Sequence, residues 1–290
     1  MNIRSLIAQK ELRFHPACIA VVTCLVVAAL YLPTFIKLWQ FWHTDPNFGH
    51  GFLVPVASLF LVWRARRRVR EIPIEIGSPP NWMLVAGLLL HFVGFRGAVL
   101  SASALSFVVV LTWLLWFFFG KRFVQEISFP LFFLVFMIPI PFLDQLTFPL
   151  KALASRVSAA VIPSFGIPIY REGTVLFLPG FTLEVATACS GLKSLVVVTA
   201  LGTFYSYMTQ DAPWKRAVMV VCCVPIALLA NIGRIAIVAL LSRAVSTESL
   251  FHIVHDYSGL PVYMIAGVLL VATGEIVQWV FRRRSTSRLP

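Results

Sequence analysis

Residues 217–242 read AVMVVCCVPIALLANIGRIAIVALLS, and this run decides the class of fold. A helix needs about 20 mostly apolar residues to cross the hydrocarbon core of a bilayer, and this run exceeds that length with Arg234 as its only charged residue. The rest of the chain is similar, because 59% of its 290 residues are apolar and 12% are charged. An ordinary soluble domain has about 45–50% apolar and about 25% charged residues. We therefore predict a protein that crosses a membrane several times.

Apolar segments recur along the chain and predict an all-α polytopic membrane protein with about eight transmembrane helices. No repeat or linker indicates a second domain, so we predict a single transmembrane domain over residues 1–290. No small-residue cleavage site follows the first segment, which we interpret as a retained span rather than a signal peptide. The predicted spans lie near residues 17–38, 50–64, 81–97, 99–119, 127–146, 188–207, 217–242 and 258–281.

The Lys and Arg residues indicate the orientation. A formal net charge of +12 would favour a nucleic-acid partner if the basic residues formed a patch, but they fall in short clusters between apolar runs. Basic loops face the cytoplasm. If the N-terminus is cytoplasmic and successive loops alternate between the two sides, every dense Lys/Arg cluster lies on the cytoplasmic side. We therefore expect both termini on the cytoplasmic side of a bacterial-type inner membrane. The clusters lie within residues 4–13, 64–70, 121–122, 215–216 and 282–288.

On this topology the longest external segment runs from about Thr147 to Thr187. Residues 151–158 mix apolar and small polar side chains, which indicates a helix at the interface or packed on the bundle. Three short stretches between residues 166 and 185 have the composition of strands, with Pro179-Gly180 as a turn. We expect a small external hairpin here.

Polar residues interrupt this pattern first at Ala188-Cys189-Ser190-Gly191, where the hairpin passes into the sixth span. The N-terminus of that helix and Lys193, one turn further on, both favour the thiolate form of Cys189. A second reading is that Ser190 and Gly191 start the helix and Cys189 only packs. The other four cysteines suit packing, and the spacing of the five predicts no disulfide framework.

The second polar feature is Arg234. Arginine in a span costs about 2.5–3.5 kcal/mol on insertion scales, which favours either a function or snorkelling to the outer headgroups. Counted from Arg216 at about 1.5 Å per residue, Arg234 lies about 27 Å above the inner face, near the depth of Cys189. Asn231 lies three residues earlier on the same face, where it can hold the guanidinium by a hydrogen bond.

The third feature precedes the last span and contains His252, His255 and Asp256. Either histidine can act as an acid or base near neutral pH, or simply face water. A third convincing ligand is missing, so we predict no metal site, and nothing indicates a cofactor. Cys189, Arg234 and His255 share one depth and supply a nucleophile, a cation for an oxyanion and a proton carrier, which together favour catalysis.

These stretches resemble the exosortase/archaeosortase family. The resemblance implies a cysteine peptidase and transpeptidase of the inner membrane that cleaves the C-terminal sorting signal of exported proteins and is associated with exopolysaccharide. That signal has a short motif such as Pro-Glu-Pro, a transmembrane helix and a basic tail. The resemblance rests on residues 188–195 (ACSGLKSL), 231–234 (NIGR) and His255 to Gly259, with support from residues 45–55, 137–141 and 166–173.

Carried onto this sequence, the resemblance implies that Cys189 is the nucleophile, Arg234 the oxyanion stabiliser and His255 the acid/base, on the periplasmic side. His252 has no glycine four residues on, and neither it nor His50 receives a role. A Cys189 thioester would then pass to an acceptor that the sequence does not identify, or to water. Candidate positioning residues are Asn231, Lys193 and Ser190.

Other classes of protein stay open on the residues alone. The first is a transporter or polysaccharide-export subunit in which Arg234 binds an anionic substrate and Cys189 packs. The second is a membrane acyltransferase that acts on lipid or sugar. An assembly factor without catalysis would not need a charge at the depth of Arg234.

Overall fold

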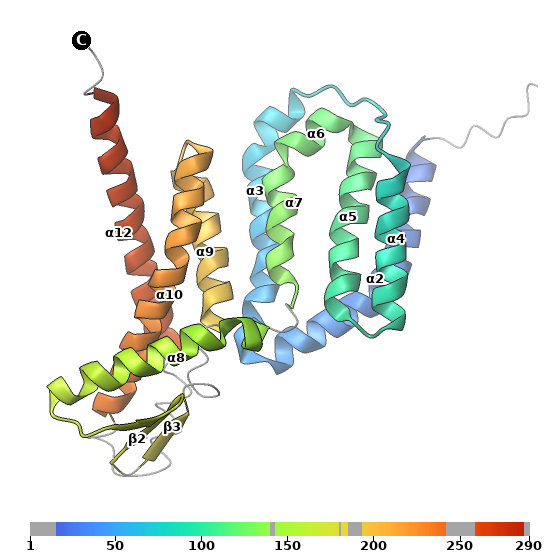
Figure 1. Cartoon of the computed structure of the whole chain (residues 1–290). Helices are drawn as coiled ribbons and strands as arrows, with labels where there is room; N and C mark the ends of the chain where they lie inside the picture. The colour runs from blue at the N-terminus through green and yellow to red at the C-terminus, as the bar shows by residue number, and fades with distance from the viewer. Residues whose placement is uncertain (1–15, 140–142, 180, 185–192, 242–258, 287–290) are drawn as a thin grey trace, which may run out of the picture. The chain divides into compact units, whose positions relative to one another are not determined.

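The structure is a computed structural model in which most of the chain is helical (Figure 1). It describes residues 16–139, 143–179, 181–184, 193–241 and 259–286. In this part, five helices are long and apolar enough to cross a membrane, and three shorter apolar helices accompany them. These helices correspond to the predicted segments, so the chain is a multi-pass helical membrane protein.

The chain divides into two compact units, residues 1–139 and 140–290, which we describe one at a time. The single domain over residues 1–290 stays a prediction. The first unit contains α2 (Pro16–Thr44), η1 (Pro46–Phe52), α3 (Leu53–Arg70), α4 (Asn81–Arg96), α5 (Leu100–Phe119), α6 (Lys121–Glu126), α7 (Ser128–Phe133) and η2 (Leu134–Met137), where η marks a 3-10 helix.

Helices α4 and α5 form a tight pair within the first unit. A Cβ atom on Gly94 would lie 2.6 Å from the backbone nitrogen of Ser103, so only glycine permits this approach. The buried Ser103 hydroxyl lies 2.7 Å from Thr34 Oγ1 of α2 and 3.0 Å from His91 Nδ1 of α4. Hydrogen bonds between membrane helices contribute about 0.6–2 kcal/mol each, so helix packing explains these polar residues.

The fifth predicted span, residues 127–146, is shorter and interrupted in the structure. Helix α7 passes into η2, which ends at Met137, and the next helix begins at Leu143. Pro139 accounts for this end, because proline disfavours helical backbone in the preceding residue, and Ile138 is extended with ψ of 127°. Trp42 Nε1 donates a hydrogen bond of 3.0 Å to the Met137 carbonyl oxygen left at the helix end.

The second unit carries a small antiparallel sheet with the strand order β1-β2-β3. Tyr170 pairs with Phe177 and Val175 with Glu184, so the predicted hairpin has a third strand. Gly173, with φ of +60°, makes the turn between β1 and β2. The elements are α8 (Leu143–Val161), η3 (Ile162–Phe165), β1 (Tyr170–Glu172), β2 (Val175–Leu178), β3 (Phe181–Glu184), α9 (Lys193–Thr209), α10 (Pro213–Leu241) and α12 (Gly259–Thr286).

Helix α8 extends the helix predicted within residues 151–158, and it packs on α10. Figure 1 shows α8 crossing α10, with the sheet beside it. One apolar cluster joins the three elements, which fixes α8 against the C-terminal half of α10. Its fully buried members include Ala154, Ile162, Leu176, Leu183, Ile235 and Ala239.

Helices α9, α10 and α12 form the bundle of this unit. A Cβ atom on Gly202 of α9 would lie 2.3 Å from Cys223 Sγ of α10 and 3.1 Å from Leu270 Cδ2 of α12. At the C-terminal end of α9, Gln278 Nε2 of α12 donates a hydrogen bond of 3.1 Å to the Thr209 carbonyl oxygen. The first contact packs α10 against α9, and the second joins α12 to the C-terminal end of α9.

Candidate functional site

The predicted catalytic residues all belong to the second unit. Cys189, Ser190 and His255 lie outside the described residues, as does His252. Lys193 is the first residue of α9, and its backbone alone is described. Arg234 and Asn231 lie on α10, where the structure gives their surroundings. The site is therefore built from α10 and the elements packed on it.

Arg234 is half-buried on α10, about two turns before the helix ends at Leu241. The 29 residues of α10 are longer than a bilayer requires, which agrees with a position of Arg234 near the membrane boundary. At this level α10 packs on α12, since a Cβ atom on Gly233 would lie 3.3 Å from Ile265 Cδ1.

Tyr263 of α12 lies within electrostatic reach of Arg234, and sequence reasoning missed it. The positive charge of Arg234 acts on the Tyr263 phenol. The signal in the sequence was weak: a single tyrosine one turn into the last span. Together, the two side chains place a cation and a hydroxyl where α10 meets α12.

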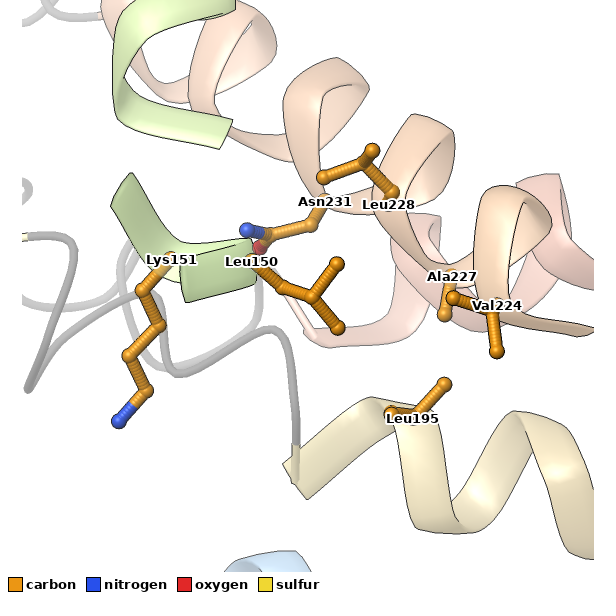
Figure 2. Close-up of a pocket in the computed structure, with 7 residues that line it drawn as sticks. All are labelled: Leu150, Lys151, Leu195, Val224, Ala227, Leu228 and Asn231. Carbon is orange, nitrogen blue, oxygen red and sulfur yellow. The ribbon is translucent and has the colours of Figure 1, made fainter. Parts of the chain in front are cut away.

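Asn231 lies one turn before Arg234 and is 4% exposed. Among the described residues its Oδ1 atom accepts no hydrogen bond, so the predicted hydrogen bond from Arg234 is not found. Residues three apart on a helix point about 60° away from each other. Asn231 points toward α8 in Figure 2, whereas Arg234 acts on α12.

Asn231 lines a narrow pocket between α8, α9 and α10, with room for about one water molecule (Figure 2). Its walls are mostly aliphatic, which lowers the local dielectric and strengthens polar contacts made there. Its polar lining residues are Asn231 and Lys151, and the Lys151 ammonium points away from the rest of the lining (Figure 2). The lining residues are Leu150, Lys151, Leu195, Val224, Ala227, Leu228 and Asn231.

Lys151 is 4% exposed, and the sequence analysis did not select it. It lies on the buried face of α8 that Ser155, Ser158 and Ile162 continue at helical spacing. The Ser155 hydroxyl donates a hydrogen bond of 3.2 Å to the Gly173 carbonyl oxygen in the β1–β2 turn. That spacing was visible in the sequence and would have placed Lys151 on the core side of the helix.

Cation and hydroxyl groups, rather than metal ligands, dominate the described part of the site. Within the described ranges, no group of three or more His, Cys, Asp and Glu side chains could hold a metal ion. A guanidinium near the membrane boundary can stabilise a developing negative charge. A buried ammonium and an amide can position a polar chain beside it.

Comparison with known proteins gives one match. The model of a family described as transmembrane exosortase matches residues 42–272, well over half of the chain. No curated protein and no solved structure matches the chain. The matched range covers most of both units and contains the stretches on which the resemblance was predicted.

Proposed function

The chain belongs to the transmembrane exosortase family, and from this premise we propose that it cleaves sorting signals with Cys189 as its nucleophile. Membership implies processing of proteins that carry a PEP-CTERM signal, by a presumed cysteine peptidase or transpeptidase. The finer proposal assigns the thiolate to Cys189, the oxyanion contact to Arg234 and proton transfer to His255.

In the proposed reaction, the transmembrane helix of the substrate docks beside the bundle and brings a peptide bond to the outer boundary. The Cys189 sulfur bonds to the carbonyl carbon, and Arg234 stabilises the oxyanion that forms. His255 protonates the leaving amine as the C–N bond breaks, which releases the helix and basic tail. An acceptor nucleophile or water then breaks the thioester and restores the thiol.

The observation that best supports this proposal is the half-buried Arg234 on a membrane helix. An intramembrane arginine is costly, and such residues usually face a bundle interior or a watery cavity. The effect of its charge on Tyr263 of α12 and the packing at Gly233 support an inward-facing position better than snorkelling to lipid headgroups. We further propose that this end of α10 faces the periplasm and that both termini are cytoplasmic.

The test is the processing of a co-expressed membrane reporter with a Pro-Glu-Pro signal. Wild type should shorten the reporter, and Cys189→Ala should abolish the mass shift at equal membrane levels. Cys222→Ala is the matched control, because this half-buried cysteine of α10 should be dispensable. Equal processing by wild type and Cys189→Ala would remove Cys189 as nucleophile and favour the transporter reading.

A further inference from the structure

We infer that a cavity at one end of the first unit binds the head of an aminophospholipid, a membrane lipid that carries a phosphate and a primary ammonium. This site is independent of the proposed peptidase reaction and shares no residue with it. The cavity has a volume of about 380 Å³, within the range of about 300–1,000 Å³ that is usual for ligand sites. It lies where the connection between α3 and α4 passes α6, at the same end of the unit in Figure 1.

The end of α5 sets the depth of this cavity in the membrane. Helix α5 is an apolar span of 20 residues, and at about 1.5 Å per residue it matches the hydrocarbon thickness of a bilayer. The cavity is lined by Phe119, the last residue of α5, and by Gly120 after it. Trp113 and Trp116 lie in the last two turns of α5, as in an aromatic belt. The cavity therefore lies at the level of the lipid headgroups, in either orientation of the chain.

Close backbone packing holds the α3–α4 connection against the end of α5. The Gly77 N–H donates a hydrogen bond of 2.9 Å to the Phe117 carbonyl oxygen, and a Cβ atom on Gly77 would overlap the Trp116 carbonyl oxygen. A Cβ atom on Gly120 would lie 3.0 Å from the Glu75 carbonyl oxygen, and Gly120 has φ of +88°, which favours glycine. The wall that carries Glu75 is thus a built part of the unit.

The polar lining of the cavity carries charges of both signs. Lys121, Arg122 and Gln125 line it from α6, and Glu75 lines it from the connection. Ammonium, guanidinium and amide N–H groups suit the oxygens of a phosphate. A carboxylate only accepts hydrogen bonds, so Glu75 would repel a phosphate and attract an ammonium. A phosphate and an ammonium on one short head, as in phosphatidylethanolamine, complement both signs.

The neighbouring ion pair shows which charges are left for a ligand. Arg68 of α3 and Glu126 of α6 pair with their Nε and Oε1 atoms 2.8 Å apart. In the part of the chain that the structure describes, Glu75 and Arg122 form no ion pair, although both line the same cavity. A headgroup with its ammonium at Glu75 and its phosphate at Arg122 would complete both and join the connection to α6.

Apolar side chains beside Glu75 favour a lipid over a soluble phosphate. Ile74 and Ile76 are 73% and 80% exposed, on either side of Glu75. At the depth where α5 ends, exposed isoleucines can pack on the first carbons of acyl chains. A free ion would use the charges of the cavity and leave these side chains in water. We therefore assign the cavity to a lipid that stays in the membrane.

Lipid binding by the purified full chain tests this inference. Native mass spectrometry in detergent can compare phosphatidylethanolamine with phosphatidylcholine of identical acyl chains. Both lipids have one phosphate and no net charge, but the choline head has no N–H donor for Glu75. Wild type should bind the ethanolamine lipid about 3- to 5-fold more tightly, as expected for one exposed ion pair.

Two kinds of variant separate the two halves of the head. Glu75→Gln should remove the preference for the ethanolamine lipid, whereas Glu71→Gln, an exposed carboxylate of the same connection outside the cavity lining, should keep it. Arg122→Gln should weaken both lipids about fivefold, because it removes a charge-assisted contact with the phosphate. Lys121→Gln should act in the same direction. Arg67→Gln is their control, because Arg67 is an exposed cation at the end of α3 outside the lining.

Three results would overturn the inference, and none of them bears on the peptidase proposal. The first is equal binding of the two lipids by wild type, or a preference that survives Glu75→Gln. The second is tighter binding of phosphatidylglycerol that depends on Arg122 and not on Glu75, which would indicate a site for anionic lipids. The third is displacement of the lipid by an equal concentration of O-phosphoethanolamine, which would indicate a soluble ligand.

Discussion

Arg234 and Lys151 are two cations of the second unit, and they lie in different surroundings. Arg234 is half-buried, and its charge acts on Tyr263. Lys151 is buried on α8, and its ammonium points away from α10 (Figure 2). A group that meets charge only in the transition state raises kcat, whereas a group that binds the substrate throughout lowers KM. We therefore expect Arg234, as an oxyanion contact, to affect kcat.

Replacing Arg234 tests whether its charge acts in the transition state. Arg234→Ala should lower kcat for reporter cleavage by about 100- to 1,000-fold with little change in KM, the usual cost of losing an oxyanion contact. Arg234→Lys should recover part of the rate, because lysine keeps the charge but loses the planar fork of donors. The measurement is steady-state cleavage at equal membrane levels. A rise in KM with unchanged kcat would instead make Arg234 a substrate-binding residue.

At the scale of elements, Gly202 is a position where α9 packs directly on both α10 and α12. Gly202→Ala should destabilise the bundle by about 1–3 kcal/mol, since its Cβ atom would lie 2.3 Å from Cys223 Sγ. Thermal unfolding in detergent measures this loss. Adding Cys223→Ala should restore part of it by removing the sulfur.

Gly267→Ala is the matched control for this prediction. Gly267 lies on α12 of the same bundle, and a Cβ atom there would meet nothing within 4 Å. Alanine also favours the helix by about 1 kcal/mol over glycine, so this variant should be neutral or more stable. A similar loss in both variants would argue against close packing at Gly202.

The same scale explains which elements the sequence could predict. Long apolar runs such as residues 217–242 predict spans by length alone, and α10 covers this run. The span predicted at residues 127–146 was too long. Its apolar composition gave no sign of the break that Pro139 imposes after Met137. The Pro179-Gly180 turn predicted strand pairing, but the pairing of β1 depends on the left-handed Gly173, which composition does not specify.

The sequence predicted a site residue where a charged side chain stands in an apolar run. It did not predict residues whose role depends on how the helices pack. Arg234 stood out because a charge in an apolar run is costly. Lys151 did not, although its helical spacing with Ser155 and Ser158 was visible, because a lysine is the residue type least expected on a buried face. The expected hydrogen bond between Asn231 and Arg234 is not found among the described residues, because Asn231 points toward α8 while the charge of Arg234 acts on Tyr263 of α12. Cys189 and His255 stay predictions.

At the scale of the whole molecule, the family match covers both units, although the candidate site lies in the second. The proposed site therefore accounts for only part of what defines the family. The proposed function also depends on the orientation of the chain in the membrane. A signal on an exported protein is accessible only if the sheet and the C-terminal end of α10 face the periplasm. The basic clusters favour that orientation.

Cysteine labelling tests this orientation. In a chain whose natural cysteines are replaced by alanine, Tyr170→Cys should react with a membrane-impermeant maleimide in intact cells, because Tyr170 is 65% exposed on β1. Arg67→Cys, exposed in the basic end of α3, should react only after the inner membrane is permeabilised. The reverse pattern would place Arg234 near the cytoplasmic face, where exported substrates are absent. The peptidase proposal would then lose its site, whatever the chemistry of Cys189.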